Sequence, residues 1–98
     1  MENQYVVKVL NNIADILEMQ GVEFKPQAYR RAAQEIEVLQ ESIEDICVRN
    51  ELEDISGVGK HIAAKIKELV ETGKLKYYKK LKKSTKIDIE ALNEIPSL

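Results

Sequence analysis

The sequence has few of the residues that several classes of protein depend on. Its one cysteine, Cys47, cannot form an internal disulfide, which is typical of a reducing compartment. No apolar run approaches the roughly 20 residues of a membrane span. The first residues also lack the basic and apolar regions of a secretion signal, so we expect a cytoplasmic protein with no membrane partner. A chain of 98 residues forms one domain at most, which excludes a large enzyme with a deep cleft of its own.

The charge of the chain is small in total but unevenly distributed. Residues 1–59 carry five basic and twelve acidic groups, a balance of −7, whereas residues 60–86 carry ten lysines and two glutamates, a balance of +8. The last twelve residues hold three acidic groups, which brings the total to −2. The pattern predicts a basic surface on an acidic body. Such a surface binds a polyanion or an acidic protein partner, and the alternative is a solvated lysine-rich face.

Apolar residues recur at spacings of three and four, the period of an amphipathic helix. We expect a first helix from a cap at Asn3 to about Met19, ended by Gly21. A second helix is expected to begin at Pro26 and to keep Leu39 on its apolar face.

Three further helices complete the predicted fold. A short helix follows Ser42, a longer one covers residues 59–72 and ends at Gly73, and a basic one covers residues 74–83. The residues of the basic helix that point inward are Leu75, Tyr78 and Leu81. No useful length of sequence alternates with period two, so the prediction is an all-α fold, a compact bundle of four to five short helices.

The most informative segment is residues 52–66, in which Gly57 and Gly59 directly precede a helix. Two glycines allow a tight turn whose N–H groups point outward, and the helix start adds partial positive charge, so the turn forms a cradle for a phosphate. The flanking elements are helices, which excludes a dinucleotide-binding turn, and the lysine-serine/threonine pair of a Walker loop is absent. The segment resembles the helix-hairpin-helix motif, which implies binding to the DNA backbone without reading its sequence. The alternative is a plain turn between two helices. Under both interpretations Ile55 and Val58 have a structural role, because they pack inward and hold the hairpin together.

The resemblance extends along the chain to the amino-terminal domain of family X DNA polymerases. It is carried by residues 25–33, by the hairpin and by residues 71–75, in order and without large gaps. The sequence of residues 13–18 is similar to that of bacterial and archaeal members of the family. Residues 92–98 resemble the opening of the family's second hairpin, so we expect a DNA-binding domain over residues 1–84, then a linker and a truncated second hairpin over residues 85–98. This implies a fragment of a longer repair polymerase.

The resemblance implies roles for particular residues. Lys65 occupies the position of the Schiff-base lysine with which some members remove 5′-deoxyribose phosphate as lyases. Helical geometry places Lys65 at the border of the apolar stripe, about 40° from Leu69. Lys25 and Tyr29 match positions that hold the 5′-phosphate and the adjacent nucleotide. The other implied DNA-binding residues are Gly57, Val58, Gly59, Lys60, His61 and Lys74.

Two residues depart from the family pattern. His61 replaces a lysine that binds phosphate, and a neutral imidazole weakens such a pocket near pH 7. Tyr77 replaces a second lysine. An active lyase and a module that only binds DNA therefore stay open as alternatives, and a helical protein-interaction domain is the third. Tyr77 and Tyr78 are candidates to stack on a base, with a core position as the alternative for Tyr78.

The resemblance also implies the cofactors and partners. The backbone carbonyls of Glu53, Ile55 and Val58 are expected to hold a Na⁺ or K⁺ ion at the hairpin, while Mg²⁺ belongs to a polymerase domain outside this chain. The expected partner is gapped, nicked or 5′-phosphorylated DNA, bound by a monomer associated with the nucleoid.

Overall fold

The computed structural model describes residues 2–84, and within this range the fold is entirely helical. Helix α1 covers Asn3–Met19, α2 covers Lys25–Glu37 and α3 covers Ile43–Val48. A single 3₁₀ turn, η1, covers Leu52–Asp54 and leads to α4 at Lys60–Thr72. Residues 76–84 are helical as well. The predicted all-α bundle is confirmed, and the expected second hairpin at residues 85–98 lies outside the described residues.

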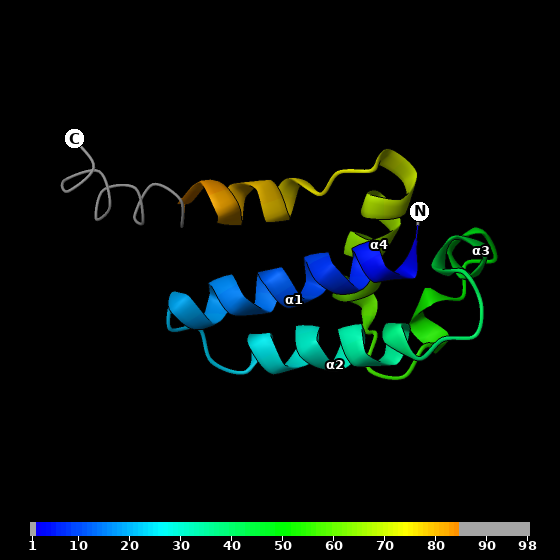
Figure 1. Cartoon of the computed structure of the whole chain (residues 1–98), viewed down its shortest axis with the longest axis horizontal. Coiled ribbons are helices and arrows are strands. Elements are labelled where there is room, and N and C mark those ends of the chain that lie inside the picture. Colours follow the sequence, from blue (N-terminus) through cyan, green and yellow to red (C-terminus); the bar gives the residue numbers. More distant parts are fainter. Residues whose placement is uncertain (1, 85–98) are drawn as a thin grey trace.

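Helix α1 is the centre of the bundle. Figure 1 shows α2 packed along one side of α1 and the helical residues 76–84 along another. The apolar stripe of α1 meets the inner faces of α2, α3 and α4 in one continuous core. The largest side chains of this core that are almost completely inaccessible include Leu10, Ile13, Ile36, Ile43, Ile66 and Leu69. Removing these side chains from water drives the helices together, because each contributes about 1.5–3 kcal/mol of transfer free energy.

The predicted cap at Asn3 is wrong, because Asn3 is the first residue of α1 and Glu2 is the cap residue. The Asn3 side chain instead joins α1 to α3. Its Oδ1 accepts a hydrogen bond from the Ile43 N–H at 2.8 Å, and its Nδ2 donates to the Glu41 carbonyl at 2.9 Å. Asn3 therefore satisfies an N–H in the first turn of a distant helix, a contact that only the tertiary fold creates.

The ends of two helices also differ from the prediction. Helix α2 ends at Glu37, so Leu39 is not on its face, although Leu39 still packs half-buried against the core. The basic helix begins at residue 76 rather than 74. Lys74 lies in a turn, where Thr72 Oγ1 donates to its carbonyl and accepts from its N–H. By contrast, Gly73 caps α4 in the left-handed conformation as predicted, with φ of 75°.

The basic helix is held by α4 at its first turn. The Glu68 carboxylate accepts a hydrogen bond from the Lys76 N–H at 2.8 Å, and a carboxylate at a helix start also favours the helix dipole. Leu75 is buried, while Tyr78 and Leu81 are half-buried against the core. The three residues predicted to point inward do so, although Leu75 precedes the helix rather than belonging to its face. No helix among residues 2–84 is long and apolar enough to cross a membrane.

Candidate nucleic-acid interface

The hairpin between η1 and α4 is closed by a tight turn. The Val58 N–H donates to the Ile55 carbonyl at 3.0 Å, and Gly57 between them has φ of 80°. Ile55 and Val58 are both buried, so they anchor the turn to the core as the sequence predicted. The turn presents the residues that follow it, Gly59 and Lys60, at the start of α4.

Gly57 is required by the fold itself. Its left-handed conformation costs about 1–2 kcal/mol for a residue with a Cβ, and an added Cβ would lie 2.9 Å from Cγ of Arg31. The Arg31 side chain is exposed and flexible, so most of the cost lies in the backbone. We therefore expect Gly57→Ala to lower the free energy of unfolding by about 1–2 kcal/mol, measured by urea denaturation. An unchanged midpoint would contradict the assigned turn.

Gly59 has a different role from Gly57. It is the N-cap of α4 in extended conformation, with φ of −89°, and a Cβ at this position would have no atom within 4 Å. It offers no side chain to cap the helix, and the first bond within α4 runs from the Ala63 N–H to the Gly59 carbonyl. The N–H groups of the first turn thus have no side-chain cap, and the space beside Gly59 is open for a phosphate to approach them.

Several of the predicted site residues line one cleft of about 400 Å³ between α2, α4 and the basic helix. Lys25 and Tyr29 come from α2, His61 and Lys65 from α4, and Tyr77 from the helix that begins at residue 76. Ala28 and Ile62 complete the lining. Three basic side chains and two phenols thus surround a space large enough for a phosphate and part of a sugar.

Lys65 differs from the other lysines in its burial. Within residues 2–84 it is the only lysine that is half-buried, and all the others are exposed. This confirms its predicted position at the border of the apolar stripe. An amine fixed at the edge of a cleft loses less side-chain entropy on binding a ligand than a lysine that moves freely in water.

The remaining predicted residues lie outside this cleft. Lys74 lines a second hollow with Lys76 and Lys79, and Lys60 lines a third with Lys67. The structure therefore does not gather the predicted set into one pocket. It forms one aromatic-walled cleft and two exposed lysine groups beside α4.

The sequence did not predict how Tyr77 is placed. The Tyr77 ring stacks on Tyr29, with centroids 6.4 Å apart and planes inclined by 14°. The Nζ of Lys65 lies over the Tyr77 ring as well, 4.7 Å from the ring centroid. Burial raises the pKa of Tyr29, and the adjacent Tyr77 raises it further, so Tyr29 stays a neutral phenol that does not repel phosphate. No spacing in the sequence indicates that residues 29, 65 and 77 meet.

Tyr78 faces a different part of the molecule. Its hydroxyl accepts a hydrogen bond from Asn12 Nδ2 at 2.8 Å, and Lys82 Nζ lies 4.5 Å from its ring centroid. Tyr78 thus fastens the basic helix to α1. This position is the core alternative that the sequence left open for Tyr78.

The basic residues divide into two groups by their ion pairs. Arg30 pairs with Asp15 and Glu18, and Arg49 pairs with Glu41 and Glu51. No lysine among residues 2–84 forms an ion pair within this range. Arg30 and Arg49 are neutralised by the acidic body, while Arg31 and the lysines keep their charge available to an external anion.

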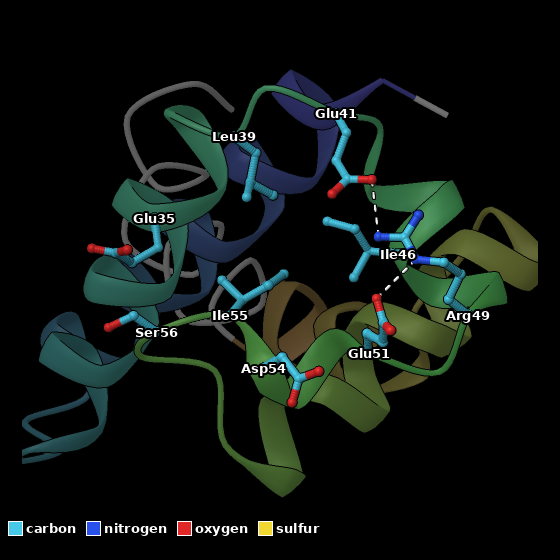
Figure 2. Close-up of a pocket in the computed structure, with 9 residues that line it drawn as sticks. All are labelled: Glu35, Leu39, Glu41, Ile46, Arg49, Glu51, Asp54, Ile55 and Ser56. Atoms are coloured by element: carbon cyan, nitrogen blue, oxygen red, sulfur yellow. Dashed lines mark hydrogen bonds and ion pairs between the residues drawn. The ribbon is translucent and has the colours of Figure 1, made fainter.

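A further cleft has the opposite charge. It measures about 300 Å³, and Figure 2 shows its carboxylates around a floor of three apolar side chains. Arg49 is its one basic side chain, held at 2.9 Å by Glu41 and at 2.8 Å by Glu51. Its acidic members are Glu35, Glu41, Glu51 and Asp54. A phosphate would be repelled here, so this cleft is not part of a nucleic-acid interface.

Side-chain metal ligands do not gather in the described part of the chain. Residues 2–84 contain no group of three or more His, Cys, Asp and Glu side chains that could hold a metal ion. Cys47 is buried, and its burial raises the pKa of the thiol. Cys47 is therefore a core residue here, as its lack of partners in the sequence indicated.

The fold and the hairpin define a small helical domain with a basic cleft and an open helix start. The chain belongs to the helix-hairpin-helix domain family, whose model matches residues 1–75. Domains of this family generally bind DNA, which indicates nucleic-acid binding for this chain. Comparison with curated proteins gives no significant match.

Proposed function

We propose that this domain binds the 5′-phosphate side of gapped or nicked DNA as the DNA-binding module of a family X polymerase in repair. The observation that carries the proposal is the cleft in which Lys25, His61 and Lys65 converge beside the start of α4. Two of these residues come from one turn of α4, four positions apart, and so face the same ligand. The cleft accepts the phosphate at the end of a strand. A continuous strand would instead bypass the cleft and lie along the exposed hairpin.

The hairpin supplies contacts of a different kind. Backbone N–H groups at Gly59 and Lys60 bind phosphate oxygens and carry no information on the base sequence. The domain is therefore expected to bind any sequence, with a preference set by the presence of a phosphate at the break.

A comparison of two DNA ends tests this proposal. Gapped DNA with a 5′-phosphate is expected to bind about 10- to 150-fold more tightly than the same DNA with a 5′-hydroxyl, because hydrogen bonds to charged groups contribute about 1.5–3 kcal/mol. Lys25→Ala should remove much of this preference. Lys8→Ala is the matched control, because Lys8 is an exposed lysine that lines none of the clefts described above. Equal affinity of the wild type for both ends, by fluorescence anisotropy, would overturn the proposal.

Gly59→Ala separates DNA binding from stability. The free energy of unfolding should change little, because a weaker N-cap and a less flexible unfolded chain have opposite effects of about 0.5 kcal/mol each. Affinity for DNA should fall about tenfold, because the added Cβ stands where a phosphate approaches the first N–H groups of α4. Loss of stability together with unchanged affinity would contradict this role of the hairpin.

We also propose a monovalent cation at the hairpin, held by the carbonyls of Glu53, Ile55 and Val58. Carbonyl oxygens suit Na⁺ or K⁺, and the Ile55 carbonyl keeps a second lone pair after accepting the Val58 N–H. Exchanging K⁺ for a bulky organic cation at constant ionic strength should then weaken binding to DNA. Equal affinity in both salts would rule this site out.

A second candidate function is a 5′-deoxyribose-phosphate lyase with Lys65 as the nucleophile. The observation in its favour is that Lys65, alone among the described lysines, is half-buried in the cleft that we propose for the 5′-phosphate. The reaction requires the free amine, with its lone pair directed at the sugar aldehyde. The surroundings of this amine therefore decide between the two functions.

A further inference from the structure

The Lys65 amine is engaged by an aromatic ring. Its Nζ lies 4.7 Å from the centroid of Tyr77, within the distance at which a ring attracts a cation. Tyr77 is itself backed by Tyr29, which is only 6% exposed. The two rings form a rigid wall, and the amine rests on its outer member.

The two residues that precede Tyr77 along the chain are both held in place. Leu75 is 3% exposed and anchors the turn before the basic helix. Between the two residues, the Lys76 N–H is held by the Glu68 carboxylate at 2.8 Å. These contacts hold the backbone that leads into Tyr77, and its ring cannot turn away from Lys65 without losing the stacking contact with Tyr29. The amine and the ring are therefore a standing feature of the cleft.

The ring acts differently on the two forms of the amine. The negative face of an aromatic ring attracts an ammonium group and gives no comparable attraction to a neutral amine. Schiff-base formation needs the neutral form, since its nitrogen attacks the C1′ aldehyde and water then leaves from that carbon. A ring on the amine opposes this attack, while it leaves the ammonium N–H groups able to donate to phosphate.

We propose that Tyr77 holds Lys65 as an ammonium ligand for the DNA phosphate, so that this cleft binds DNA ends without forming a Schiff base. The inference rests on the proposed function, in which the cleft receives the 5′ end of a break. It assigns Tyr77 as the residue that selects binding over lyase chemistry.

Borohydride trapping tests the inference. The chain is incubated with incised DNA bearing a 5′-deoxyribose phosphate, and borohydride supplies the hydride that reduces any imine to a stable secondary amine, with a proton from water. The wild type is expected to give little adduct. Tyr77→Leu removes the ring and should raise the initial rate of adduct formation about 2- to 30-fold, the range of a cation–π contact. Tyr77→Phe keeps the ring and should behave as the wild type.

Two further variants keep the test decisive. Tyr77→Gln also removes the ring, so the test needs only one of these two variants to fold. Thermal unfolding followed by circular dichroism shows which of them is folded. Adding Lys65→Ala to Tyr77→Leu should abolish the adduct. The inference is overturned if the wild type forms adduct as fast as Tyr77→Leu, if no variant forms any, or if the adduct persists without Lys65.

A separate measurement identifies a failure of the proposed function itself. The affinities of wild type and Tyr77→Phe for gapped DNA are compared with 5′-phosphate and 5′-hydroxyl ends. A phosphate preference together with rapid trapping in the wild type would leave DNA-end binding standing and overturn only the role of Tyr77. The absence of any phosphate preference would remove the proposed function and the inference with it.

Discussion

The affinity of this domain for gapped DNA is expected to fall about 100-fold when salt rises from about 50 to 200 mM, if four phosphates are neutralised. The physical reason is the release of counterions that lysines displace from DNA. The lysines of residues 2–84 are not paired within this range, so their charge is available. Fluorescence anisotropy with labelled gapped DNA gives the slope of log affinity against log salt.

Matched variants assign this salt dependence to particular residues. Neutralising Lys74, Lys76 and Lys79 together should lower the slope by up to about three, since each lysine that contacts a phosphate contributes about one. Arg49→Gln is the control, because Arg49 is already paired with Glu41 and Glu51. A flat salt response, or no measurable affinity for DNA, would instead favour a domain that binds an acidic protein partner.

The largest effect on stability is expected at the interface of α1 and α2. Ile36 is 0% exposed, and Ile36→Ala should lower the free energy of unfolding by about 2–5 kcal/mol through lost burial and the cavity left behind. Domains of this size are stable by about 5–15 kcal/mol, so the variant loses a large share of its stability. Urea denaturation followed by circular dichroism measures the change.

Val38 provides the comparison for Ile36. It lies two residues further along the chain and is 68% exposed, so Val38→Ala should change the free energy of unfolding by no more than about 0.5 kcal/mol. Similar losses in both variants would mean that the packing of α2 on α1 does not hold this end of the bundle.

The helices and the hairpin were predictable because their signals are local. Apolar residues at helical spacing placed α1, α2 and α4 to within a few residues, and the glycines placed the turn. Gly57 and Gly73 adopt positive φ as their positions predicted. The ends of α2 and of the basic helix were predicted less well, because hydrogen bonds in the adjoining turns decide where a helix stops.

The candidate site was predictable only in part. The resemblance named Lys25, Tyr29, His61 and Lys65, and the fold brings these four together in one cleft. It also named Lys60 and Lys74, which lie elsewhere. The roles of all these residues stay predictions that the variants above address.

The sequence by itself determined the fold class, the hairpin and the asymmetry of charge, because each follows from residues close together in the chain. Only the tertiary structure decided which charges remain available, by pairing Arg30 and Arg49 with acidic side chains and leaving the lysines unpaired within residues 2–84. It also decided that Tyr77 lies on Lys65. These contacts join residues from separate helices, and the distance between such residues depends on how the helices pack, which no local pattern encodes.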